Sequence, residues 1–213
     1  MRRLYPFLFL PLKFIPLLLV ACGTETLPKP SENGCAPAYV GQNRLETVQQ
    51  VSASCAVTIE APPLLPVEHV SPGVPLGHNS NPATSGKHFG RWASYVEREY
   101  PLDPGLYVHN LEHGGVVLFY HCDLRSQCPE LATALSTIAN NLPQDQVCSG
   151  EGKRNRVIVA PDPTLDTQVA VAAWGWLYKA ACVDAASLSN FIAAHYGQGP
   201  ECTCFDGTAA DEP

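Results

Sequence analysis

Nine cysteines constrain the fold of this 213-residue chain more than any other feature of its sequence. Cys22 belongs to a motif near the N-terminus, which leaves an even number of cysteines for pairing. In an exported protein, an even set of this size predicts up to four disulfide bonds. The short spacings favour two local pairs, Cys35 with Cys55 and Cys122 with Cys128. The remaining cysteines are Cys148, Cys182, Cys202 and Cys204.

The N-terminal residues are typical of an export signal. Arg2 and Arg3 precede an apolar run, Phe14 to Ala21, which Lys13 separates from the earlier apolar residues. Neither apolar stretch reaches the ~20 residues that a membrane-spanning helix needs. The pattern therefore indicates a cleaved signal peptide.

The residues Leu19-Val20-Ala21-Cys22 resemble a bacterial lipobox. The resemblance implies cleavage before Cys22, lipidation of this cysteine and anchoring of the mature protein to a membrane of the bacterial cell envelope. Gly23, rather than aspartate, follows the cysteine, which implies sorting to the outer membrane. Ordinary secretion, with Cys22 removed or unmodified, stays open as the alternative.

Charge and length narrow the classes of protein further. Removal of residues 1–21 takes away three basic residues and leaves 192 residues, with ten basic and twenty acidic side chains. This acidic balance argues against nucleic-acid binding, which needs basic patches. The expected segments are a signal peptide (1–21), a tether with an extension stapled by Cys35 and Cys55 (22–66), one main domain (67–201) and an acidic, frayed tail (202–213).

Regular structure is expected mainly after residue 114. Short apolar runs rich in β-branched residues predict strands, and apolar residues at helical spacing predict helices. The expected elements are strands at 115–121, 157–160 and 169–179 and helices at 129–142 and 187–196. We expect the third strand to pair with the second. This β-α-β-β-α order predicts an α+β fold, a small mixed sheet with its helices on one face, preceded by a loop-rich, disulfide-stapled extension.

The stretch HNLEHGG, residues 109–115, contains the H-x-x-E-H pattern of inverted zinc peptidases. On a straight strand, His109 and His113 would lie about 13 Å apart, too far for one metal ion with bonds near ~2 Å. On a helical turn the same two residues are neighbours and can chelate. Because Pro104-Gly105 and Gly114-Gly115 flank the stretch, we expect a compact turn that leads into the strand.

Three upstream histidines lie in a loop-rich segment and can complete a metal site: His69, His78 and His88. Glu112 can serve as a further ligand, as a general base, or as a partner that orients a histidine. Imidazole ligands suit copper or zinc, and the sole methionine is the initiator, so the processed chain offers no thioether to a soft ion. The pattern predicts a divalent transition-metal site.

Five motifs occur in order along the chain: NPATSGKH, VHNLEHGGVVLFYH, VIVAP, AAWGW and GPE. Over residues 67–201 they resemble the DUF3105 family, a group of mostly exported or membrane-anchored bacterial proteins of unknown function. The resemblance favours His69 over His78 as the ligand that joins His88, His109 and His113. It implies no activity.

Two enzyme hypotheses stay open beside a metal-binding lipoprotein. A metal-dependent hydrolase would use His109, Glu112 and His113, but such peptidases need a further downstream glutamate, and Glu201 lies in an expected turn. A thiol-disulfide oxidoreductase would use the strand–cysteine–helix region around Cys122. Its C-x5-C spacing departs from C-x-x-C and favours a structural disulfide.

Overall fold

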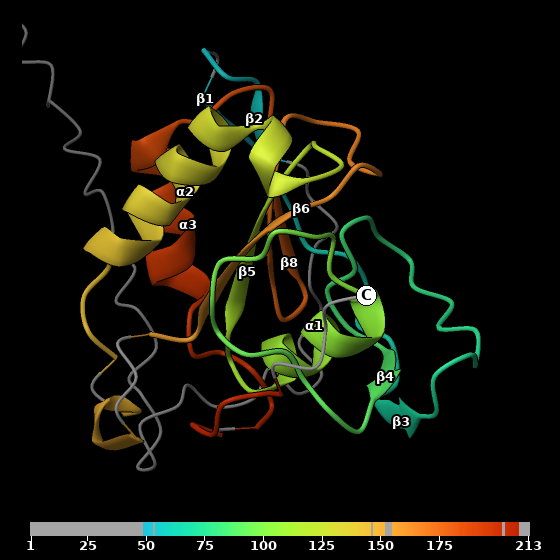
Figure 1. Cartoon of the computed structure of the whole chain (residues 1–213). Helices are drawn as coiled ribbons and strands as arrows, with labels where there is room; N and C mark the ends of the chain where they lie inside the picture. The colour runs from blue at the N-terminus through green and yellow to red at the C-terminus, as the bar shows by residue number, and fades with distance from the viewer. Residues whose placement is uncertain (1–48, 53, 146, 152–154, 202, 209–213) are drawn as a thin grey trace, which may run out of the picture.

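The computed structural model describes residues 49–208 apart from residues 53, 146, 152–154 and 202. The strands are β1 (Gln49–Ser52), β2 (Val57–Glu60), β3 (Glu68–Val70), β4 (Lys87–Phe89), β5 (Val116–Tyr120), β6 (Val157–Pro161), β7 (Val169–Ala173) and β8 (Trp176–Ala180). The helices are α1 (Pro104–Glu112), α2 (Pro129–Asn141) and α3 (Ala185–His195), with 3-10 turns η1 (Arg125–Gln127) and η2 (Ser149–Glu151). Figure 1 shows their arrangement.

Six of these strands form one mixed sheet in the order β1-β2-β8-β7-β5-β6. β5 and β6 are parallel, because α2 carries the chain back between them. The other neighbours in this sheet are antiparallel. These observations confirm the α+β class and the mixed sheet. β3 and β4 form a separate parallel pair.

The expected third strand, 169–179, is in fact the hairpin of β7 and β8, which turns at Gly175 with a φ of +67°. β7 pairs with β5 and not with β6, so the expected pairing of second and third strands is wrong. The connection after β6 is long enough to pass around the end of β5. There the His121 nitrogen donates to the Gln168 carbonyl at 2.9 Å.

The two faces of the sheet are covered by different elements. Alternate residues of a strand point to opposite faces, so Val116, Leu118 and Tyr120 of β5 pack in a core with α2 and α3. Val117 and Phe119 pack in a second core with α1. The two helices expected from the sequence thus share one face, and α1 with its preceding loops covers the other (Figure 1).

Within the described residues, one of the two predicted disulfides is confirmed and one is wrong. Cys122 bonds to Cys128, which links the end of β5 to the start of α2. Cys55 bonds to Cys182 and not to Cys35. The reason is the antiparallel pairing of β2 with β8, which brings Cys55, just before β2, close to Cys182, just after β8. β2 therefore extends the sheet into the segment before residue 67.

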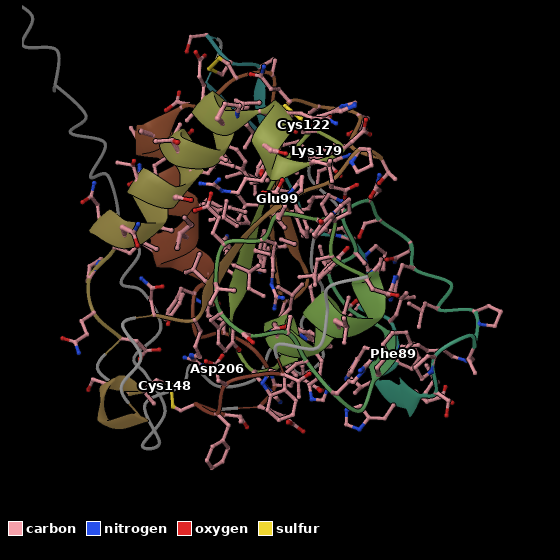
Figure 2. All side chains as sticks on the ribbon, in the orientation of Figure 1. Phe89, Glu99, Cys122, Cys148, Lys179 and Asp206 are labelled. Carbon is pink, nitrogen blue, oxygen red and sulfur yellow. A yellow bond between two sulfur atoms is a disulfide. The ribbon has the colours of Figure 1, made fainter. Side chains whose placement is uncertain are left out.

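The C-terminal segment is fastened to the body of the molecule. Cys204 bonds to Cys148 (Figure 2), and Trp92 Nε1 donates to the Phe205 carbonyl at 3.1 Å. The Thr208 nitrogen donates to the Trp92 carbonyl at 3.0 Å. The expectation of a frayed tail is therefore wrong for residues 203–208. None of the helices in the described part of the chain has the length and apolar content needed to cross a membrane.

The predicted signal peptide and the predicted lipidation of Cys22 lie outside the described residues.

Candidate metal centre

The H-x-x-E-H residues lie at the C-terminal end of α1, a helix of nine residues rather than the single turn expected. Asp103 caps the helix by accepting a hydrogen bond from the Gly105 nitrogen at 2.7 Å. Pro104 occupies the first helical turn, where its missing N–H costs nothing. Pro104 and Gly105 therefore begin the helix instead of preceding it. Gly114 ends it at a φ of +84°, a conformation that favours glycine.

Two short strands bring the upstream histidines to α1. β3 and β4 pair with His69 opposite His88. Gly105 lets β4 approach the helix, because a Cβ at that position would lie 2.5 Å from the Phe89 ring; Figure 2 labels Phe89 beside α1. His109 Nδ1 donates to the Phe89 carbonyl at 2.7 Å, which ties the helix to the strand.

Three histidine rings surround one carboxylate oxygen. The Nε2 atoms of His88, His69 and His109 lie 3.0, 3.7 and 3.9 Å from Glu112 Oε2. His88, His109 and Glu112 are buried, whereas the His69 side chain is 51% exposed. One ligand atom from each of the four residues lies within 4.8 Å of the others, so the set can hold a metal ion. We call His69, His88, His109 and Glu112 the inner group.

Hydrogen bonds to the backbone indicate which ring nitrogens carry protons. His88 Nδ1 lies 2.8 Å from the Gly86 carbonyl, and His109 Nδ1 makes the bond to Phe89. A carbonyl oxygen only accepts, so both Nδ1 atoms donate, and in a neutral ring Nε2 is then a lone pair. Neither His88 Nε2 nor Glu112 Oε2 makes a well-directed hydrogen bond, although only 3.0 Å separates them. Acceptors therefore face acceptors across the centre of the group.

The electrostatics of the site favour the protonation states that a metal needs. Burial lowers the pKa of His109, and it lowers the pKa of His113 to about 4, so both rings are neutral near pH 7. Burial raises the pKa of Glu112, but the close imidazole of His88, at 3.0 Å, and those of His109 and His69 outweigh this, and the net pKa is lowered. A metal ion binds imidazole in its neutral form and carboxylate in its ionised form.

His113 does not join the inner group. Its Nε2 lies 3.4 Å from Glu201 Oε2, and a second set with ligand atoms within 4.8 Å consists of His109, Glu112, His113 and Glu201. The sequence placed His113 on the same ion as His88; in the structure the two residues belong to adjoining sets that share two members. We call His113 and Glu201 the outer pair. Sequence reasoning considered Glu201 only as the downstream glutamate of a peptidase and set it aside because it lies in an expected turn.

Comparison with known proteins covers the whole of this constellation. The family described as "Protein of unknown function (DUF3105)" matches residues 69–206, which include every donor from His69 to Glu201. The chain belongs to the DUF3105 family. Searches of curated proteins and of solved structures gave no match. The family description assigns no activity, so the function of this DUF3105 protein has to be argued from its geometry.

A buried polar network supports the end of α1 in this DUF3105 protein. Arg156, with a side chain 1% exposed, donates from Nε to Asp145 Oδ2 at 3.0 Å and from Nη1 to the His113 carbonyl. The Tyr196 hydroxyl donates to the same Asp145 oxygen at 2.6 Å. The guanidinium stabilises the negative C-terminal end of α1, so the network fixes the backbone that carries His113.

Trp92 forms an aromatic wall of the site. Its ring centroid lies 4.8 Å from that of His109 and 4.5 Å from that of His113. Asn110 of α1 holds the neighbouring backbone, because its side chain accepts from the Ala93 nitrogen at 3.0 Å and donates to the Ala93 carbonyl at 2.8 Å. Trp92 is therefore a fluorescent reporter in direct contact with two of the donors.

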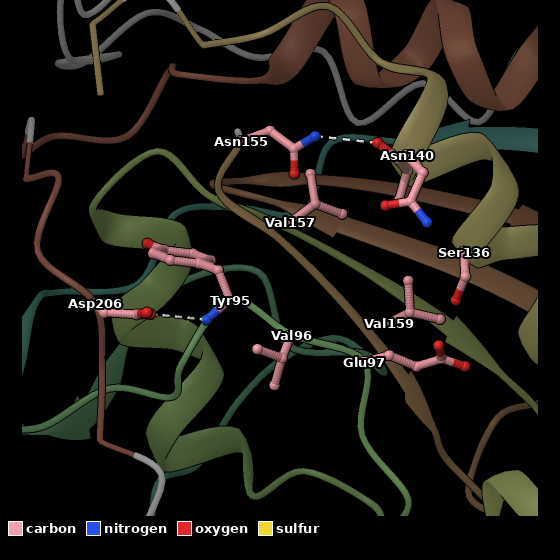
Figure 3. A pocket seen from close by; sticks show the side chains of 10 residues that line it. Tyr95, Val96, Glu97, Ser136, Asn140, Asn155, Val157, Val159 and Asp206 are labelled. Atoms are coloured by element: carbon pink, nitrogen blue, oxygen red, sulfur yellow. Dashed lines mark hydrogen bonds between the residues drawn. The ribbon is translucent and has the colours of Figure 1, made fainter. Parts of the chain in front are cut away.

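A separate hollow of about 450 Å³ lies between α2, β6 and the segment around Tyr95 (Figure 3). Hydrogen bonds span its rim, from Asn155 Nδ2 to the Ala139 carbonyl at 3.0 Å and from the Tyr95 nitrogen to Asp206 Oδ1 at 3.0 Å. The hollow has no histidine in its lining and shares no residue with the inner group or the outer pair.

Proposed function

We propose that this protein is a lipoprotein of the bacterial cell envelope that binds a divalent transition metal ion, zinc or copper, through its inner group. The observation that carries the proposal is the convergence of three imidazole Nε2 atoms on one carboxylate oxygen, with the Nδ1 protons of two rings committed to backbone carbonyls. A proton shared between Glu112 Oε2 and one ring nitrogen would remove the repulsion of that nitrogen–oxygen contact alone. A cation at the centre relieves all of them together.

The spacing of the donors fits a tetrahedral ion. Bonds of 2.0–2.1 Å to nitrogen and oxygen place neighbouring ligand atoms roughly ~3.3 Å apart. The three separations from Glu112 Oε2, 3.0, 3.7 and 3.9 Å, bracket that value. Small movements of His69 and His109 therefore complete the geometry, and the half-exposed His69 gives an ion a route from solvent.

The chemistry of the donors favours zinc or Cu(II). Imidazole and carboxylate ligands suit these ions, whereas Cu(I) prefers thiolate or thioether sulfur. In the described part of the chain, the cysteines whose side chains are placed form disulfide bonds and are not available as thiolates; they are Cys55, Cys122, Cys128, Cys148, Cys182 and Cys204.

The envelope location rests on the lipobox-like residues that end at Cys22. Anchoring to a membrane through a lipid on this cysteine, with sorting to the outer membrane, is the expected consequence. Fractionation of cells that produce the wild type or Cys22→Ala tests this part independently. The wild type is expected in the membrane fraction, and the variant, if it is exported, in the soluble fraction. A wild type found in the soluble fraction would contradict the anchor.

Elemental analysis is the decisive test of metal binding. We expect the exported Cys22→Ser protein, purified from metal-replete cells, to contain at least about one zinc or copper ion per chain. Glu112→Gln and His88→Ala are each expected to weaken binding more than about 100-fold, because loss of an outer-shell partner alone costs 10–100-fold. Quenching of Trp92 fluorescence by Cu²⁺ gives a second readout, with Trp92→Phe as its blank.

His121→Ala is the matched control, since His121 is exposed and lies at the far end of β5. It should leave metal content unchanged. A wild type that binds neither Zn²⁺ nor Cu²⁺ would mean that the three rings form a hydrogen-bonded cluster. In that case His88→Ala should unfold the protein, as judged by circular dichroism, without a change in metal content.

A metal-dependent hydrolase is the second candidate, because Glu201 supplies the downstream glutamate that the H-x-x-E-H pattern needs. Its base would be Glu112. The position of Glu112 Oε2 among the inner histidines favours binding over this role. Cleavage of a peptide library by metal-loaded wild type, lost in a Glu112→Gln variant that keeps its metal, would favour the hydrolase.

A further inference from the structure

We propose that the outer pair forms a second cation site, so that Glu112 bridges two divalent ions. The proposal rests on the proposed function, because the bridging carboxylate belongs to the inner group. The second ion would bind His113, Glu201 and the Glu112 carboxylate, one ligand atom of each being already within 4.8 Å of the others. Bridged pairs of this kind hold ions about 3.5–4 Å apart.

His109 cannot serve both sets at once. Its Nδ1 donates to the Phe89 carbonyl, which leaves only Nε2 for a metal. Glu112, in contrast, has two oxygens and can bind an ion with each. If His109 completes the inner set, the outer ion has one imidazole and two carboxylates. This harder donor set, with Glu201 52% exposed, predicts a weaker and solvent-open site.

The chain holds Glu201 in place more firmly than a solvated surface glutamate requires. The Glu201 nitrogen donates to the Glu112 carbonyl at 2.9 Å, and the Gly197 nitrogen donates to the Gly114 carbonyl at 2.8 Å. Between them, Gly199 lies so close to α1 that a Cβ would fall 2.1 Å from the Glu112 carbonyl oxygen. The backbone that carries this half-exposed carboxylate is thereby fixed beside a buried imidazole.

The imidazole is buried without a full set of partners. The His113 side chain is 3% exposed, and its Nδ1 has no hydrogen-bond partner in the described structure. Its backbone is fixed by Arg156, and its ring packs edge-on against His109 at 4.5 Å between centroids. A structural histidine gains little from this arrangement. A ligand needs a fixed ring that lies close to a carboxylate.

Titration with Co²⁺ tests the second site. The exported wild type, stripped of metal, is expected to bind two equivalents by calorimetry, one tighter than the other. Glu201→Gln, which keeps the shape of the side chain, should lose the weaker equivalent and leave the tighter affinity within about threefold. Glu130→Gln is the matched control, since Glu130 is exposed and distant in sequence; it should keep both equivalents.

The outcomes separate the two proposals. Two equivalents in the wild type and one in Glu201→Gln support the second site. One equivalent in both proteins overturns the second site and is still consistent with the inner site. Two equivalents in both proteins have the same meaning, because Glu201 is then not a ligand. No binding by the wild type overturns the proposed function itself. Because electron paramagnetic resonance intensity per cobalt falls when a carboxylate couples two ions, we also expect a lower intensity per cobalt at saturation in the wild type alone.

Discussion

Two buried carboxylates near the C-terminal end of α1, Asp145 and Glu112, differ in their surroundings. Asp145 is surrounded by donors: Arg156 Nε, the Tyr196 hydroxyl and the backbone nitrogens of Val147 and Cys148. Its pKa is lowered, because these bonds and the charge of Arg156 outweigh the burial that raises it. A carboxylate with so many donors has no need of a ligand.

Glu112 lacks such donors, because the Nδ1 protons of His88 and His109 are committed to backbone carbonyls. Its Oε2 faces three Nε2 atoms and makes no directed hydrogen bond. A buried polar atom left without a partner costs about 1–3 kcal/mol, and more when it is charged. The comparison gives a criterion for such clusters: where donors match acceptors the cluster is structural, and where acceptors meet acceptors it is suited to a cation.

The largest effect is expected when the matched cluster is broken. Arg156→Met leaves Asp145 as an unpaired buried charge, so the free energy of unfolding should fall by about 3–5 kcal/mol. Urea denaturation of the metal-free protein measures it. Arg91→Met, at an exposed position, should change stability by less than about 0.5 kcal/mol. Equal effects of the two substitutions would show that the network does not stabilise the fold.

A pH titration separates the two clusters. His113 has its pKa lowered to about 4 in the folded protein, against ~6.5 when unfolded. The unfolded state therefore binds the proton first, and stability that is intact above pH ~6.5 is lost as the pH falls toward 4, by up to about 3 kcal/mol. The pKa of Asp145 is also lowered. The stability that this carboxylate contributes is lost only as the pH falls below ~3.9, the pKa of an aspartate in the unfolded chain.

Denaturant midpoints of the metal-free protein, measured from pH 8 to 3, check this order. The wild type should lose stability in two stages, and His113→Gln should lose less stability than the wild type in the first of them, where His109, whose pKa is also lowered, still titrates. A His113→Gln profile that matches the wild type between pH 6.5 and 4 would show that another group titrates there.

The smallest effect, and the sharpest contrast, comes from two conservative amide substitutions. Asp145→Asn should cost about 1–3 kcal/mol, because the amide replaces an acceptor that four donors share. Glu112→Gln should change the stability of the metal-free protein by less than about 1 kcal/mol, since its new NH₂ group can donate to a bare Nε2. Thermal denaturation without metal compares them. A larger loss for Glu112→Gln would reverse the assignment of the two clusters.

Sequence patterns predict the buried strands β5 and β6 from their apolar runs and a helix whose two sides differ, and they miss a helix that is buried all round. α2 has apolar residues on one face and is found by its periodicity. Every residue of α1 from Gly105 to Glu112 is buried, so no amphipathic pattern marks it. β7 and β8 form one apolar run in which only Gly175 indicates the turn.

The candidate metal ligands also include some that the sequence predicts and one that depends on tertiary structure. His88 and His109 are predicted because histidines are few and their motifs are close together in the chain, and the family resemblance favours His69 over His78. Glu201 is brought to His113 by the packing of Gly199 on the end of α1, which depends on tertiary structure and not on spacing. Cys182 meets Cys55 for a similar reason, because strand pairing and not sequence distance decides the partner.

The Cys55–Cys182 bond links the redox state of the chain to the proposed metal site. The two bonded cysteines are 127 residues apart in sequence. The loop that they close contains the inner group and His113. Closing a loop of this size lowers the chain entropy of the unfolded state, which raises the free energy of that state by about 5 kcal/mol. A chain made in a reducing cytosol lacks this constraint, so fewer molecules hold their donors together. Under the proposed function, an exported chain should therefore acquire its ion after oxidation outside the cytosol, whatever the metal supply at the site of synthesis.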